Sequence, residues 1–237
     1  MFPLYSDKPL SHFPFVTIFL IIANTVVFWL QLTSPGSVRQ SVILYGMIPY
    51  DLFDSGALSI PDRIPVWLTF FTSMFMHGGF IHLGMNMLYL WVFGRNVEDD
   101  VGHMRFLLFY LAAGILATAA FVTAFPTAIV PLVGASGAIA GVLGVYFLRF
   151  PASRVFCLVI FFFFIRIIPL PAFFILGLWF AIQIGACMTS LTSPEGAAGM
   201  GGVAWISHVT GFVVGIIWTI FELRRRYYLR KRRDNTA

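Results

Sequence analysis

One serine in this sequence is placed as the nucleophile of an enzyme would be. Ser136 lies between Gly134 and Gly137 at the start of an apolar stretch, so its hydroxyl is unhindered. If that stretch is a helix, the backbone N–H of Ser136 is one of the donors that the first turn leaves unpaired, and it could hold an oxyanion. Acyl transfer needs this geometry. A face of small residues for helix packing in a membrane is the alternative interpretation.

Three further polar residues could complete this chemistry. A serine alcohol is a poor nucleophile until a base takes its proton, and His208 is the candidate base. His82 and Asn86 are four residues apart, so they share one face of a helix and could both donate to a developing oxyanion. All ten acidic residues fall in loops, tails or segment ends, so we expect a Ser–His dyad without a carboxylate.

The histidines also have other interpretations. A histidine inside a membrane often serves only packing or hydrogen bonding. His82 and His208 could also ligate a haem between helices. His12, His77 and His103 lie at flanks or segment ends, where a polar ring costs little, and we assign them no role.

The composition is that of a membrane protein. Of 237 residues, 59% are hydrophobic and 11% charged, and the mean hydropathy is +0.88, which leaves too few polar residues to cover a soluble globule. Seven of the fifteen lysines and arginines crowd into 224–233, directly after an apolar run. This pattern is typical of a cytoplasmic membrane flank, so the net charge of +5 does not indicate a nucleic-acid partner.

Six apolar segments could cross a hydrocarbon core about 30 Å thick, which takes about 20 helical residues. They are Phe13–Leu32, Phe80–Gly94, Phe106–Phe125, Ser136–Leu148, Pro171–Ser190 and Ala204–Leu223. We therefore expect an all-α polytopic membrane protein with a cytoplasmic segment (1–12), a six-helix membrane domain (13–223) and a basic cytoplasmic tail (224–237). A seventh apolar run, Val155–Ile168, carries Arg166 and ends at prolines, and we interpret it as interfacial.

The charges predict the orientation. With six spans both ends of the chain share one side, and the basic tail assigns that side to the cytoplasm. Thirteen of the fifteen positive charges then lie inside, and only Arg39 and Arg63 lie outside. We expect a multi-pass protein of the lipid bilayer, in a bacterial cytoplasmic membrane.

The candidate residues should lie at similar depths. Ser136 is 149 − 136 = 13 residues from the cytoplasmic Arg149, about 20 Å along a helix, so this short fourth helix would begin inside the membrane. The same count gives about 24 Å for His208 and about 20 Å for His82. Ionisable residues inside a bilayer usually mark a functional site.

In chain order, three motifs resemble those of the rhomboid family of intramembrane serine proteases. They are His82-Leu-Gly-Met-Asn86, Gly134-Ala-Ser-Gly137 and His208-Val-Thr-Gly-Phe-Val-Val-Gly215. The resemblance implies that Ser136 is the nucleophile and His208 the general base, with His82 and Asn86 as oxyanion donors. It also implies a six-helix bundle that cleaves transmembrane segments of other proteins, with no metal or cofactor.

Two positions depart from the family's pattern. Trp67 is followed by Leu68 where the family often has arginine, and Ala140 stands where many members have a tyrosine that stacks on the histidine. What orients His208 is therefore open. A catalytically inactive membrane-protein binder is the second hypothesis for the function, although such relatives typically lack the serine or the histidine. A haem-binding or transport protein is the third.

Close helix packing is a further expectation. For the two dyad residues to share a hydrogen bond of about 2.6–3.2 Å, their helices must approach closely. Gly137 and Gly141 on one helix, and Gly211 and Gly215 on the other, form small-xxx-small faces that permit this approach.

Access to the site should depend on the fifth span and the loop after it. We expect the glycine-rich Leu191–Gly202 to form a mobile lid. Phe173, Phe174 and Trp179 of the fifth span are either gate residues or lipid-facing.

Overall fold

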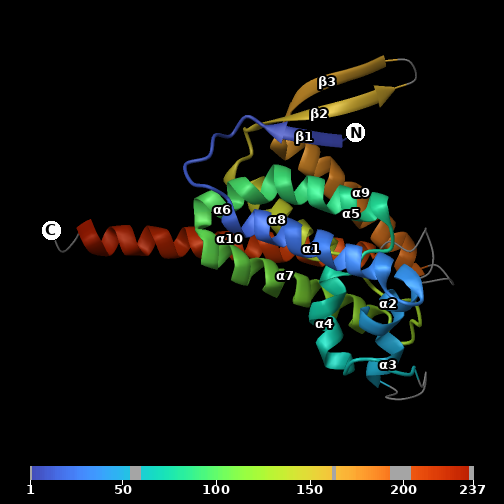
Figure 1. Ribbon diagram of the computed structural model, residues 1–237. Coiled ribbons are helices and arrows are strands. Elements are labelled where there is room, and N and C mark those ends of the chain that lie inside the picture. Colours follow the sequence, from blue (N-terminus) through green and yellow to red (C-terminus); the bar gives the residue numbers. More distant parts are fainter. Residues whose placement is uncertain (1, 54–59, 162–163, 193–203, 235–237) are drawn as a thin grey trace.

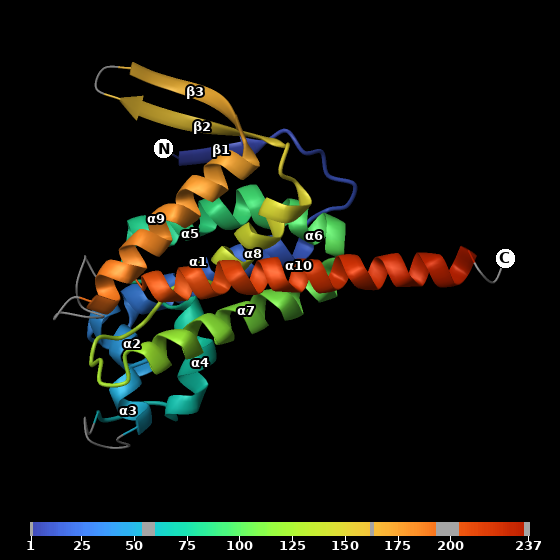
Figure 2. The ribbon, with the colours of Figure 1, turned by 180° about the vertical axis from the view of Figure 1, so that it is seen from behind.

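The computed structural model describes residues 2–53, 60–161, 164–192 and 204–234 (Figure 1). In these ranges four helices are long and apolar enough to cross a membrane. They are α1 (Phe15–Thr33), α7 (His103–Ala124), α9 (Ala172–Thr192) and the Trp205–Leu229 part of α10 (Trp205–Asp234). Figures 1 and 2 show that these helices form one bundle, and that α10 projects well beyond it at the C-terminal end.

Two shorter helical segments lie among the long helices. In the first, α5 (Phe80–Tyr89), the π-helical η3 (Leu90–Gly94) and α6 (Arg95–Val101) follow one another without a break. The second is α8 (Ser136–Arg149), which has only 14 residues. Its residues from Gly137 to Tyr146 are all buried, so α8 is the centre of the bundle.

A three-stranded antiparallel sheet departs from the all-helical expectation. Its strands, in the order β1-β2-β3, are β1 (Phe2–Ser6), β2 (Arg154–Phe161) and β3 (Phe164–Pro171). The described residues of the predicted interfacial run Val155–Ile168 thus lie in the paired strands β2 and β3, which suits their β-branched and aromatic side chains. In Figures 1 and 2 the sheet lies on the flank of the bundle beside α9.

Short helices build the segment between α1 and α5. They are α2 (Ser37–Tyr45), α3 (Pro49–Phe53), η1 (Val66–Leu68), α4 (Thr69–Thr72) and η2 (Ser73–Phe75). An ion pair between the largely buried side chains of Asp51 and Arg63 ties this segment together. Met47 also pairs with Leu132 through two backbone hydrogen bonds, of 3.0 and 2.7 Å, which anchor the segment to the chain just before α8.

The beginning of α1 is capped from another helix. The first turn of α1 has no acidic residue of its own. Glu98 of α6 instead accepts hydrogen bonds from the backbone N–H groups of Val16 (2.8 Å) and Thr17 (2.7 Å). A carboxylate at a helix N-terminus satisfies the unpaired donors and interacts favourably with the helix dipole. Glu98 therefore fixes α1 against the turn between α6 and α7.

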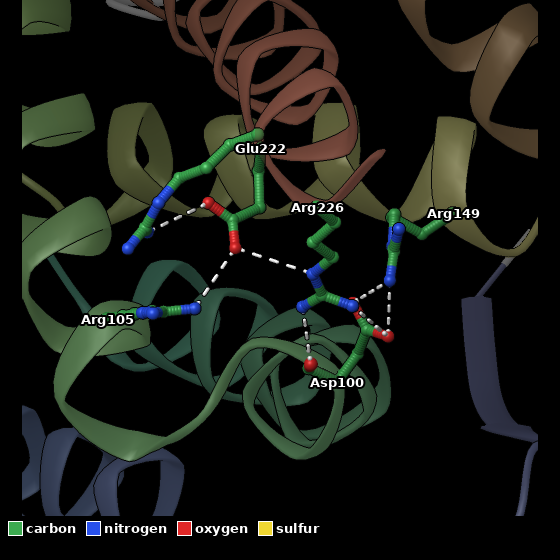
Figure 3. A network of polar contacts seen from close by, with 6 residues as sticks. Asp100, Arg105, Arg149, Glu222 and Arg226 are labelled. Atoms are coloured by element: carbon green, nitrogen blue, oxygen red, sulfur yellow. Dashed lines mark hydrogen bonds and ion pairs between the residues drawn. The ribbon is translucent and has the colours of Figure 1, made fainter. Parts of the chain in front are cut away.

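Ion pairs join four elements at the end of the bundle from which α10 projects (Figure 3). Asp100 of α6 lies 2.5 Å from Arg149 at the end of α8 and 3.7 Å from Arg226 of α10. Glu222 of α10 contacts Arg226 at 3.4 Å and Arg105 of α7 at 3.0 Å. The network thus holds α8 and α10 against the same turn.

Candidate active site

The structure brings the four predicted site residues to one cavity. Ser136 of α8, His208 of α10, and His82 and Asn86 of α5 all line a cavity of about 880 Å³. Three helices that are far apart in the sequence therefore contribute polar side chains to the same space. Apolar residues, among them Phe80, make up much of the rest of the wall.

Ser136 is the first residue of α8, and the geometry requires a glycine two positions before it, at Gly134. Gly134 has φ +116°, a conformation that residues with side chains rarely adopt. A Cβ at Gly134 would lie 2.7 Å from Nε2 of His82. The N–H of Gly134 donates to the carbonyl of Ser73 at 2.9 Å, which fixes this turn. The glycine thus allows the chain before the serine to lie against the His82 ring.

His208 is held by residues to which the sequence analysis gave no such role. Its Nδ1 lies 2.8 Å from Oε1 of Gln183, a buried residue of α9. The rings of Trp179 and Trp205 flank the imidazole, with centroids 5.9 and 6.2 Å away. In the ranges that the structure describes, no hydrogen bond joins His208 to Ser136. Catalytic hydrogen bonds are often long in enzymes without substrate.

Asn86 also has a partner to which the sequence assigned no role. Its Nδ2 donates to Nε2 of His77 at 3.0 Å. Nδ1 of His77 lies 3.3 Å from the carbonyl of Phe75, and because a carbonyl only accepts, Nδ1 carries the hydrogen and Nε2 is free to accept. Gln31 of α1 bonds both the N–H and the carbonyl of His77, at 3.0 and 3.2 Å. His77 is fully buried, so it is more than a polar ring at a segment end.

The four glycines bring the backbones of α8 and α10 into contact. A Cβ on Gly211 would lie 2.1 Å from the carbonyl oxygen of Gly137, and a Cβ on Gly215 would lie 2.1 Å from that of Gly141. These positions have no room for even a methyl group. Helices that approach this closely carry small residues at their contact.

The predicted access elements differ in how they relate to the cavity. Phe173 and Phe174 are 52% and 51% exposed and lie on the outside of the bundle. Trp179 packs against His208 and, at 6.1 Å between centroids, against Phe212. The predicted lid Leu191–Gly202 falls almost entirely outside the described residues.

The described ranges contain no cluster of side chains that could form a metal site. No group of three or more His, Cys, Asp or Glu side chains there is placed to hold a metal ion.

The fold and the cavity together define a class: a helical membrane protein with a serine, two histidines and an asparagine around one cavity. Residues 65–225 match the family model of the Rhomboid domain, so this chain belongs to the rhomboid family. The resemblance expected from the three motifs is confirmed, and the chain is an integral, multi-pass membrane protein.

Several curated relatives carry protease names. Over 130 residues the chain is 32% identical to Rhomboid protease GluP of Bacillus subtilis, covering 55% of this chain and 23% of that relative. It is 30% identical over 181 residues to mitochondrial Rhomboid protein 1 of Saccharomyces cerevisiae, covering 74% of this chain and 48% of that relative. For the putative rhomboid protease YdcA of Bacillus subtilis the identity is 34% over 134 residues, covering 56% and 61%. In each case the chain spans less than two thirds of the relative's length.

Proposed function

We propose that this chain is an intramembrane serine endopeptidase that cleaves transmembrane segments of other membrane proteins. The observation that carries this proposal is the convergence of Ser136, His208, His82 and Asn86 on one cavity. The family membership and the protease names of the relatives support it. Polar side chains are costly inside a membrane, so four of them around one space favour a function over packing.

The chemistry follows from the roles that these residue types can play. Ser136 Oγ attacks the scissile carbonyl while His208 takes its proton, and His208 then donates that proton to the leaving amine. The oxyanion is stabilised by the backbone N–H of Ser136 and by the side chains of His82 and Asn86. A water molecule then attacks the acyl-enzyme, again with His208 as base, and regenerates the serine.

The proposed membrane arrangement has six spans. They are α1, the continuous segment α5–η3–α6, α7, α8, α9 and α10. Because six spans return the chain to its starting side, both ends lie together, and the basic tail puts them in the cytoplasm. We place the protein in a bacterial cytoplasmic membrane, with the cavity open toward the outside.

Labelling with a fluorophosphonate tests the nucleophile. The wild-type protein should be labelled and Ser136→Ala should not, because only an activated serine attacks the probe. Ser207→Ala is the control: Ser207 is a buried serine whose hydroxyl donates to the carbonyl of Ala117, so this variant should be labelled like the wild type. Equal labelling of wild type and Ser136→Ala would contradict the proposal, and a wild type that stays unlabelled would favour the inactive membrane-protein binder.

A further inference from the structure

A single amide side chain lies deep in an otherwise apolar part of α9. Gln183 is 4% exposed, and its neighbours along the helix are largely apolar. A buried amide without a hydrogen-bond partner costs free energy, more so within a membrane. The contact recorded for its oxygen is with the imidazole of His208 at 2.8 Å. The hydrogen bond to His208 therefore explains why an amide is buried at this position.

The direction of this hydrogen bond determines which nitrogen of His208 carries the hydrogen. An amide oxygen can only accept, so Nδ1 of His208 must be the donor to Oε1 of Gln183. A neutral imidazole has one N–H, and Nε2 is then left with its lone pair. His208 lines the same cavity as Ser136, so this lone pair is available to a proton from the serine.

We propose that Gln183 is a positioning residue that holds His208 in the tautomer and orientation in which Nε2 can take the proton of Ser136. This inference rests on the proposed function. Gln183 takes the place that a carboxylate has in a Ser–His–Asp triad: it fixes the tautomer but brings no charge to stabilise the imidazolium. A neutral amide is also far cheaper than a carboxylate to bury in an apolar span.

The surroundings of His208 support an orienting function for this contact. Trp179 and Trp205 flank the ring, with interplanar angles of 33° and 83°, and limit its rotation about the Cβ–Cγ bond. Together with Gln183 they hold the imidazole at a place where Ala140 leaves no aromatic ring on α8 to stack on it. Gln183 and Trp179 both belong to α9, so two of the three contacts that orient the base depend on the packing of α9 against α10.

Kinetics separate positioning from general packing. Gln183→Leu keeps most of the volume but removes the acceptor, and it should lower kcat roughly 10–100-fold, by analogy with the partners that orient metal-bound histidines through their second nitrogen. KM should change less than about 2-fold, because a lost transition-state interaction lowers kcat and kcat/KM alike. Gln183→Glu, which retains an acceptor, should recover much of the rate. Ser190→Ala is the control, since Ser190 is buried on the same helix and its hydroxyl donates to the carbonyl of Cys187 rather than to His208.

Nitrogen NMR of histidine-labelled wild-type protein tests the tautomer without any need for activity. His208, assigned by the loss of its signals in His208→Asn, should show a protonated Nδ1 and an unprotonated Nε2, and Gln183→Leu should shift it toward a mixture of tautomers. A wild-type His208 with its hydrogen on Nε2, or a Gln183→Leu protein with wild-type kcat, would overturn the inference. A protein that shows the expected tautomer but cleaves nothing would count against the proposed function and leave the role of Gln183 in orienting His208 intact.

Discussion

At the scale of single residues, two of the four site side chains are held by hydrogen-bond partners that do not line the cavity. His208 bonds Gln183 through Nδ1, and Asn86 bonds His77 through one N–H. His208 keeps Nε2 free, and Asn86 keeps the second N–H of Nδ2 for an oxyanion. Such paired partners hold a catalytic group in place before substrate arrives, which avoids reorganisation during the reaction.

Removal of one oxyanion donor should slow cleavage without abolishing it. Asn86→Ala and His82→Ala should each lower kcat by about 10²–10³, the typical cost of one such donor. Asn96→Ala is a matched control, because Asn96 is a buried asparagine that bonds Ser6 and the carbonyl of Lys8 rather than the cavity. Steady-state cleavage of a transmembrane substrate measures the effect, and a wild-type kcat in Asn86→Ala and His82→Ala would contradict their assignment.

Residue types and spacing predict the four polar residues at the cavity, but not the hydrogen-bond partners of His208 and Asn86. Gln183 is 25 positions from His208, on a helix whose register against α10 only tertiary packing determines. His77 is nine positions from Asn86, across the turn at Gly78 and Gly79, so its spacing follows no helical period. A signal was nevertheless present, because an isolated glutamine in an apolar span needs a buried partner.

At the scale of elements, the contact between α8 and α10 determines how close the two dyad residues can come. The backbone of one helix lies against that of the other at Gly137–Gly211 and Gly141–Gly215. This contact follows from the glycine spacing, which the sequence displays directly. The sheet could not be predicted in the same way, since β1 lies at the N-terminus and pairs with β2, about 150 residues later in the chain.

Larger residues in this glycine contact should separate the two helices. Gly211→Val and Gly215→Val would each place a Cβ 2.1 Å from a backbone oxygen, and we expect activity to fall by about 10² or more, because a misplacement of about 1 Å is enough for such a loss. Gly177→Val is the control, since a Cβ there would lie 3.7 Å from the side chain of Phe147, an ordinary van der Waals distance. Activity assays on variants with retained fold decide the question: equal damage from Gly177→Val and Gly215→Val would mean that the glycine contact is not what brings the dyad together.

At the scale of the whole molecule, ion pairs outside the cavity form a second connection between α8 and α10, the helices that carry Ser136 and His208. The network of Asp100, Arg105, Arg149, Glu222 and Arg226 ties the end of α8 and the 222–226 part of α10 to the turn between α6 and α7 (Figure 3). Its members are up to 126 positions apart in the sequence. The charge count predicts that all three of these arginines lie on the cytoplasmic side of the membrane, but it does not predict their partners.

Replacement of Asp100 should weaken this ion-pair network and lower the free energy of unfolding. In Asp100→Asn both Arg149 and Arg226 lose a charged partner, and we expect the free energy of unfolding to fall by about 1 kcal/mol, the upper end for partly exposed pairs. Arg225→Gln is the control, because Arg225 is 56% exposed and lies 3.6 Å from Glu222, and it should change stability by less than about 0.5 kcal/mol. Detergent-based unfolding curves measure both, and equal effects would argue against a special role for the network.

The most direct test that Ser136 and His208 form a catalytic dyad is an assay of transmembrane-substrate cleavage in proteoliposomes. The assay compares the wild type, Ser136→Ala, His208→Ala and the double variant. Each single variant should lose cleavage down to the background while remaining folded and inserted. The double variant should be no worse than either single one, because a nucleophile and its base act as a unit and their losses do not add. Continued cleavage by Ser136→Ala, or losses that multiply in the double variant, would contradict the dyad.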